Sequence, residues 1–270
     1  MAPTLPVALL PRMAGRTTRL AARTAFDVAT LTAETWALGP VESRRDAIVR
    51  RWAAAMLRAL GVTVIAAPAL SSGLWTEAFL PRGMEDGSTG RVVVSNHRSM
   101  VDILVMLAAF GGHLLSRDDL ARWPVLGRLA PYAGTLYVDR SDKASGSAAL
   151  RAMVSRLRLG RSLTIFPEGT TYPDDEVRDF HPGAFAAALR TGAPVLPVGL
   201  AYDGDHATFF QEPFLAHATR LLEAPETRVA LAVGEPLDTR GASLREVQEE
   251  AHRAVQALVH TARATLLGLA

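Results

Sequence analysis

Residues 91–110 read RVVVSNHRSMVDILVMLAAF. The stretch opens with a short run of β-branched valines, which is typical of a buried strand. It closes with about ten mostly apolar residues, which favour a buried helix. A polar turn that contains His97 lies between the two. The stretch therefore predicts a strand, a turn and a helix, which together form the repeating unit of an α/β fold.

The same alternation of strand and helix continues along most of the chain. We expect strands over 62–66, 91–95, 135–138, 162–166, 194–200 and 228–233. We expect helices near 100–110, 141–159, 182–191, 213–222 and 243–267, the last of which opens with a capping box at Ser243 and Glu246. This alternation predicts an α/β domain, with a central, largely parallel or mixed β-sheet flanked by helices.

Residues 1–60 predict an N-terminal pair of basic amphipathic helices, over 16–38 and 44–60. The segment holds nine arginines and four acidic residues, whereas the whole chain has a net charge of only +2. Such a pair fits an anionic membrane surface, and two ordinary helices that pack on the domain are the alternative. We therefore divide the chain into residues 1–60, for membrane-surface binding, and residues 61–270, for the domain with the site.

We expect neither a membrane-spanning helix nor a secretory signal. The longest stretch without a charged residue, 59–76, is interrupted by Gly61 and Pro68, and a span needs about 20 apolar residues. The N-terminus lacks an apolar core followed by a small-residue cleavage site. The chain also has no cysteine, which excludes disulfides, thiolate nucleophiles and cysteine-ligated metals.

Polar residues follow three of the predicted strands. Asn96 and His97 follow strand 91–95, Arg140 follows 135–138, and Glu168 follows 162–166. The carboxyl ends of parallel strands meet at one edge of a sheet, which is where α/β proteins place their sites. The sequence therefore predicts a site that combines a histidine, an arginine and a carboxylate.

His97 and Asp102 have the chemistry of a base and its orienting carboxylate. A neutral imidazole can accept the proton of a hydroxyl group, and an ionised aspartate can fix the tautomer and stabilise the imidazolium. The alternative is structural: Ser99 caps the helix, Asp102 lies in its first turn, and His97 belongs to a surface loop. The spacing of the two residues alone does not decide between these interpretations.

Four sequence blocks in order resemble the PlsC-type glycerolipid acyltransferase family. They are NHRSMVD at 96–102, GTLYVDR at 134–140, FPEGT at 166–170 and VLPV at 195–198. The resemblance implies an O-acyltransferase of phospholipid biosynthesis, which moves a fatty acyl group from acyl-CoA or acyl carrier protein to a lysolipid hydroxyl. It implies 1-acyl-sn-glycerol-3-phosphate as the acceptor and phosphatidic acid as the product. It also implies membrane association, peripheral or monotopic, at the cytoplasmic face.

The resemblance also assigns roles to residues. It implies that His97 is the general base, that Asp102 orients it, and that Arg140 suits an anionic head group. Residues matched to substrate binding are Asn96, Arg140, Glu168, Gly169, Thr170 and Thr171. We expect no cofactor beyond the acyl donor and no metal.

One position departs from the family pattern. Many lysophosphatidate acyltransferases have arginine after FPEGT, whereas this chain has Thr171. The change removes one phosphate-binding cation, and FPEGTT also occurs in relatives that acylate lyso-ornithine lipid. A lyso-ornithine lipid, or another lyso-amino-acid lipid, is therefore the alternative acceptor.

Other classes of protein fit less well. A hydrolase would need a nucleophile or metal motif, and the chain has no GxSxG, HExxH or P-loop pattern. A nucleic-acid binder would need a recognised motif and more aromatic residues beside the arginines. A catalytically silent membrane-binding scaffold is the non-enzyme alternative, and the intact His97, Asp102 and Glu168 argue against it.

Overall fold

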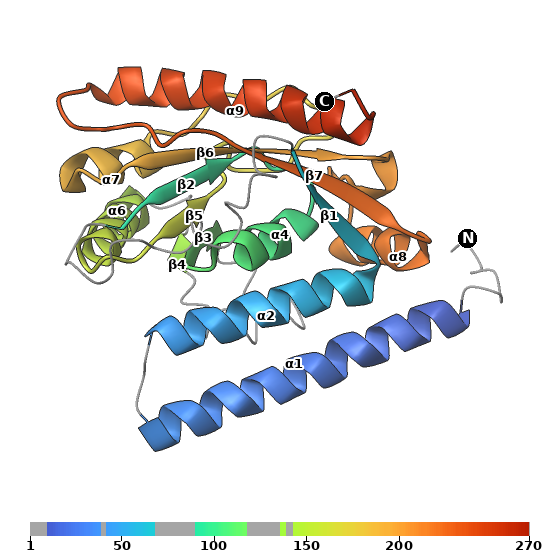
Figure 1. Cartoon of the computed structure of the whole chain (residues 1–270). Helices are drawn as coiled ribbons and strands as arrows, with labels where there is room; N and C mark the ends of the chain where they lie inside the picture. Colours follow the sequence, from blue (N-terminus) through green and yellow to red (C-terminus); the bar gives the residue numbers. More distant parts are fainter. Residues whose placement is uncertain (1–9, 39–41, 68–89, 118–135, 139–142, 270) are drawn as a thin grey trace.

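The computed structural model describes residues 10–38, 42–67, 90–117, 136–138 and 143–269. Within these residues seven strands form one sheet, and helices cover both of its faces (Figure 1). The predicted α/β class is therefore confirmed.

The strands follow the order β1-β7-β6-β2-β5-β3-β4 across the sheet. Their bounds are β1 Val62–Ala66, β2 Val92–Ser95, β3 His113–Arg117, β4 Leu136–Val138, β5 Leu163–Ile165, β6 Val195–Tyr202 and β7 Thr227–Val233. Neighbouring strands are parallel except β6 and β7, which run antiparallel. The central strand β2 thus lies between two parallel neighbours, β5 and β6, and the carboxyl ends of these three strands meet at one edge.

The helices cover the sheet in layers. They are α1 Leu10–Leu38, α2 Glu42–Leu60, α4 Val101–Phe110, α6 Lys143–Arg158, α7 Gly183–Thr191, α8 Phe214–Glu223 and α9 Leu244–Leu266. Because strand side chains alternate, Val93 packs with α2 and α4, while Val92 and Val94 pack with α6, α7 and α9. Figure 1 shows α9 along one face of the sheet and α4 on the other, with α2 and then α1 beyond α4.

Strand β3 is the element that the sequence pattern missed. It follows Gly111 and Gly112, whose φ angles of 61° and 75° turn the chain sharply after α4. Its sequence, HLLSR, alternates poorly and is too polar to predict a buried strand. Parallel pairing of its backbone with β5 and β4 places it in the sheet instead.

The two N-terminal helices pack on the domain. Trp52 and Met56 of α2 are buried in the same apolar cluster as α4. Helix α1 lies outside α2, and Trp52 Nε1 donates a hydrogen bond to Thr24 Oγ1 at 3.2 Å. Arg16 of α1 donates to four backbone carbonyls at the C-terminal end of α8. The predicted helical pair is therefore confirmed, while the division of the chain at residue 60 stays a prediction.

Candidate active site

His97 and Asp102 meet at the carboxyl edge of the sheet. His97 follows β2, and Asp102 lies in the first turn of α4. Nδ1 of His97 is 2.8 Å from Oδ2 of Asp102. The Asp102 side chain is completely buried, whereas 17% of the His97 side chain is exposed. The structure thus places a partly accessible imidazole against a buried carboxylate.

The carboxylate of Asp102, in the first turn of α4, points back to the loop that precedes the helix. Helix α4 begins at Val101, and Met100 holds the N-cap position without a side-chain hydrogen bond. Oδ2 of Asp102 instead accepts the backbone N–H groups of Arg98, at 2.6 Å, and Ser99, at 2.8 Å. The N-cap thus lies one residue after the predicted Ser99, although Ser99 Oγ still accepts the backbone N–H of Val101 at 3.2 Å.

Hydrogen bonds hold the Asp102 carboxylate in place and fix the tautomer of His97. Besides the two backbone groups and His97, the hydroxyl of Tyr202 donates to Oδ1 of Asp102. A carboxylate oxygen accepts hydrogen bonds, so the proton of the neutral His97 ring sits on Nδ1. Nε2 is then left with its lone pair. The ring stacks on Phe166 with centroids 4.1 Å apart, so its orientation is also fixed.

Glu168 joins the His97 loop to a loop farther along the chain. One carboxylate oxygen accepts the backbone N–H of His97 at 2.6 Å, and the other accepts the N–H of Arg178 at 2.8 Å. Burial raises the pKa of Glu168 to about 7, and the nearby charge of Asp102 adds to the rise. Gly169 follows at a φ of 83°, which lets the chain turn just after Glu168. This geometry favours a structural role for Glu168 over contact with a head group.

The other predicted substrate-binding residues differ in their surroundings. Asn96 is buried, and its amide pairs with both backbone groups of Leu200 on β6, which favours a structural role. Thr170 is exposed, whereas Thr171 is only 8% exposed. Arg140 lies outside the described residues.

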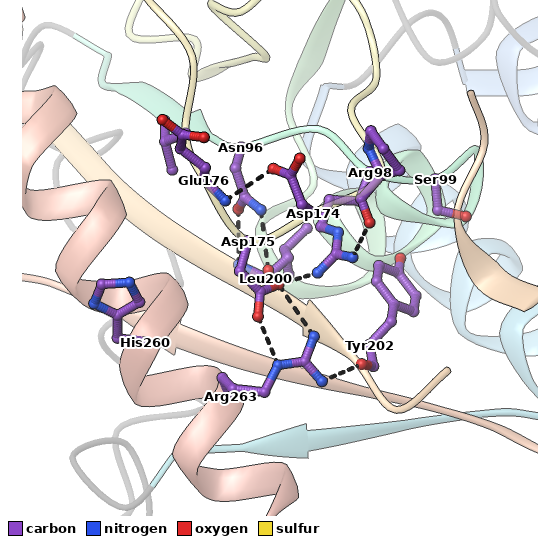
Figure 2. A network of polar contacts seen from close by, with 12 residues as sticks. Asn96, Arg98, Ser99, Asp174, Asp175, Glu176, Leu200, Tyr202, His260 and Arg263 are labelled. Carbon is purple, nitrogen blue, oxygen red and sulfur yellow. Dashed lines mark hydrogen bonds and ion pairs between the residues drawn. The ribbon is translucent and has the colours of Figure 1, made fainter. Parts of the chain in front are cut away.

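Figure 2 shows a polar network that holds the loop after FPEGT, residues 172–179, beside the carboxyl edge of the sheet. Arg98 donates to the Asp175 carboxylate and to the carbonyl of Pro173. Asp175 also accepts from Arg263 of α9 at 2.6 Å, and Arg263 donates to the carbonyl of Tyr202. The network ties the His97 loop, the 172–179 loop, β6 and α9 together.

Tyr202 and Arg98 are the site residues that the sequence analysis missed. The prediction listed the residues that follow three strands, but it ended strand 194–200 two residues early. Strand β6 runs on to Tyr202 because its last residues pair with β7, Ala201 with Ala230 and Tyr202 with Val229. Applying the strand-end rule to β6 would have found Tyr202.

Comparisons with known proteins agree on one class of enzyme. A family model described as Acyltransferase matches residues 77–201. A lyso-ornithine lipid O-acyltransferase from Pseudomonas aeruginosa is 36% identical over 181 residues, which cover 64% of this chain and 69% of the relative. A 1-acyl-sn-glycerol-3-phosphate acyltransferase from Neisseria gonorrhoeae is 32% identical over 113 residues, which cover 42% of this chain and 44% of the relative.

A solved structure has the same fold. The crystal structure of the 1-acyl-sn-glycerophosphate acyltransferase PlsC from Thermotoga maritima matches with a TM-score of 0.69. The match covers 96% of this chain and 97% of that one, at 21% sequence identity. It includes the N-terminal helices as well as the sheet.

Replacing Glu168 should change how stability depends on pH. The pKa of about 7 in the folded protein lies above the ordinary value of about 4.3, so between these pH values the folded state keeps a proton that the unfolded state has released. The free energy of unfolding of the wild type should therefore fall by about 1–3 kcal/mol from pH 5 to pH 8, relative to Glu168→Gln. Urea unfolding at both pH values measures the difference. Glu250→Gln, at an exposed position of α9, is the control, and parallel profiles for wild type and Glu168→Gln would contradict the prediction.

Proposed function

Because the chain belongs to the PlsC-type acyltransferase family, we propose that it moves a fatty acyl group from a thioester donor to the free hydroxyl of a lysolipid. The donor is acyl-CoA or acyl carrier protein, and the first acceptor is 1-acyl-sn-glycerol-3-phosphate. The contact of 2.8 Å between His97 and Asp102 supports the proposal most directly. The donor brings the activated acyl group, so the reaction needs no resident cofactor.

In this proposal, His97 carries the proton through the reaction. Nε2 of His97 accepts the proton of the lysolipid hydroxyl while its oxygen attacks the thioester carbonyl. The charge of Asp102 stabilises the imidazolium that forms. As the tetrahedral intermediate collapses, the carbon–sulfur bond breaks and His97 returns the proton to the departing thiolate. The ester, the free thiol and neutral His97 remain, and no acyl group is attached to the protein.

Removing the base or its partner should reduce turnover. General base catalysis is worth about 10²–10⁴-fold, so His97→Ala should lose at least about 100-fold in kcat. Asp102→Asn should also lose most of the activity, because the tautomer of His97 is no longer fixed by a charge. A thiol reagent can follow the reaction without background from the protein, because the chain has no cysteine. His260→Ala, on the exposed side of α9, is the control, and His97→Ala activity within threefold of wild type would overturn the mechanism.

The loop beside the site gives a reason to keep a second acceptor. Arg178 is the one cation of residues 172–179, and it pairs with Asp174 at 2.7 Å and with Glu176. Tyr172 N donates to the carbonyl of His97 at 2.9 Å, so this loop lies next to the base. A loop whose cation is already compensated favours a zwitterionic head group over a phosphate monoester. Together with the Pseudomonas relative, this observation supports lyso-ornithine lipid as the second candidate.

Freeing Arg178 should change the choice of acceptor. Thr171 is mostly buried, so substitutions in the 172–179 loop test the choice of head group more directly than a substitution of Thr171. The double variant Asp174→Asn, Glu176→Gln should raise kcat/KM for 1-acyl-sn-glycerol-3-phosphate about tenfold relative to lyso-ornithine lipid, because the guanidinium becomes available to phosphate. Asp238→Asn removes a carboxylate from an exposed ion pair with Arg240 and is the control. A ratio unchanged within twofold would mean that the loop does not face the head group.

Helix α1 supports attachment to a membrane surface. Phe26 and Trp36 are 64% and 91% exposed, and most of its other described exposed residues are alanine or threonine, with Arg19 the one charge among them. A face with aromatic side chains and a single, basic charge suits the interface of a bilayer. Among the described residues, no helix has the length and apolarity needed to cross a membrane. We therefore propose that α1 lies on the membrane with this face toward the lipid.

The arginines of α2 should add an electrostatic part to membrane binding. Arg44, Arg51 and Arg58 are exposed, whereas the two other arginines of α2, Arg45 and Arg50, are half-buried. Each arginine near an anionic surface adds about 1 kcal/mol.

Co-sedimentation with liposomes separates the two contributions to binding. Phe26→Ser with Trp36→Ser should weaken binding to all vesicles at least about tenfold, and replacing the three exposed arginines of α2 by glutamine should weaken binding to anionic vesicles alone. Leu159→Ser, at another exposed apolar position, is the control. Unchanged binding of the aromatic variant would contradict the proposed orientation of α1.

A further inference from the structure

We propose that Tyr202 is a positioning residue of this reaction, whose hydroxyl fixes the Asp102 carboxylate in the orientation that holds His97. The inference rests on the proposed function, in which His97 is the general base. Tyr202 has no contact with His97 among the described interactions and acts through Asp102. The two carboxylate oxygens would then have separate tasks: Oδ1 is fixed by the phenol, and Oδ2 faces the imidazole.

The backbone holds Tyr202 at the right place for this task. Tyr202 is the last residue of β6, which is parallel to β2, and 1% of the residue is exposed. Its hydroxyl donates to Oδ1 of Asp102. Its carbonyl accepts a hydrogen bond of 2.6 Å from Arg263, which is itself paired with Asp175 (Figure 2). Both ends of the residue are therefore anchored, so the phenol presents a fixed donor to the carboxylate.

A buried histidine, His217, contacts the loop that carries His97 and Ser99. His217 of α8 is completely buried, with Nε2 at 3.3 Å from Ser99 Oγ and Nδ1 at 3.3 Å from a guanidinium nitrogen of Arg220. Nδ1 also lies 3.6 Å from a carboxylate oxygen of Glu212, which pairs with Arg220. Burial lowers the pKa of His217 to about 4, so this histidine stays uncharged at neutral pH.

The phenol itself also stays protonated. Burial and the charge of Asp102 raise the pKa of Tyr202 well above its usual value, so it remains a donor throughout the assay range. The charged and titratable groups around Asp102 are His97 and Arg98 from its own loop, Tyr202 from β6, Glu168 from the loop after β5 and His217 from α8. Of these, Tyr202 alone binds Oδ1 in the described contacts. Its donation withdraws negative charge from the carboxylate and so sets how firmly Asp102 holds the imidazolium proton.

The variant Tyr202→Phe removes the hydroxyl and keeps the ring. We expect kcat to fall about tenfold at the pH optimum, because the carboxylate is less firmly held, with both KM values unchanged within twofold. Without the phenol, Asp102 is more basic and holds the imidazolium proton more firmly. The acidic limb of the kcat–pH profile should therefore move to higher pH by about half a unit to one unit. Thr239→Val is the matched control, because it removes a buried hydroxyl that donates to the Ala193 carbonyl far from the dyad.

A second variant predicts a shift of opposite sign. Installing 3-fluorotyrosine at position 202 alone gives a more acidic, stronger donor of nearly the same size, so the acidic limb should move to lower pH. A purely structural role would lower activity equally at every pH and leave the limb in place. An unmoved limb in both variants would therefore overturn the proposal, even if kcat falls. If His97→Ala is inactive while both limbs stay in place, only the role of Tyr202 fails; if His97→Ala is active, the proposed function itself fails.

Discussion

The buried carboxylate of Asp102 is the constraint on which the site depends. A carboxylate without solvent is unfavourable unless it is paired and hydrogen-bonded. Here two backbone N–H groups, the imidazole of His97 and the hydroxyl of Tyr202 surround it. Each of these contacts also fixes something else: the loop after β2, the tautomer of the base, or the end of β6. The backbone N–H groups of Arg98 and Ser99 stabilise the carboxylate, and the carboxylate in turn holds the loop between β2 and α4 in one conformation.

The topology of the sheet explains why these groups meet. Strands β5, β2 and β6 are parallel neighbours, so FPEGT, the His97 loop and Tyr202 emerge at the same edge. Glu168 then links the first two segments through the backbone of His97, and Asn96 links β2 to β6 through Leu200. Residues that were expected to bind substrate are thus used to hold the strand ends together.

Much of the fold followed from the sequence, and particular physical reasons explain the rest. Apolar periodicity located six of the seven strands that the structure describes, and β3 was missed because its place depends on pairing rather than on pattern. The contact of His97 with Asp102 was implied by the family resemblance, because the spacing of the two residues alone also allowed a structural role for each. The hydrogen bonds of Glu168 and Asn96 could not be predicted, because a sequence motif specifies the residue type but not which backbone groups its side chain binds. Tyr202 was missed because the predicted strand ended at residue 200, two residues before β6 ends.

The central claim is that Asp102 holds the proton of His97 on Nδ1 and leaves Nε2 free to act as the base. Nitrogen-15 NMR of the histidine-labelled protein measures this tautomer directly, with the signals of His97 assigned by their loss in His97→Ala. At a pH where the ring is neutral, the account predicts a protonated Nδ1 and an unprotonated Nε2. It also predicts that Asp102→Asn populates the other tautomer. A wild-type His97 with its proton on Nε2 would contradict the account.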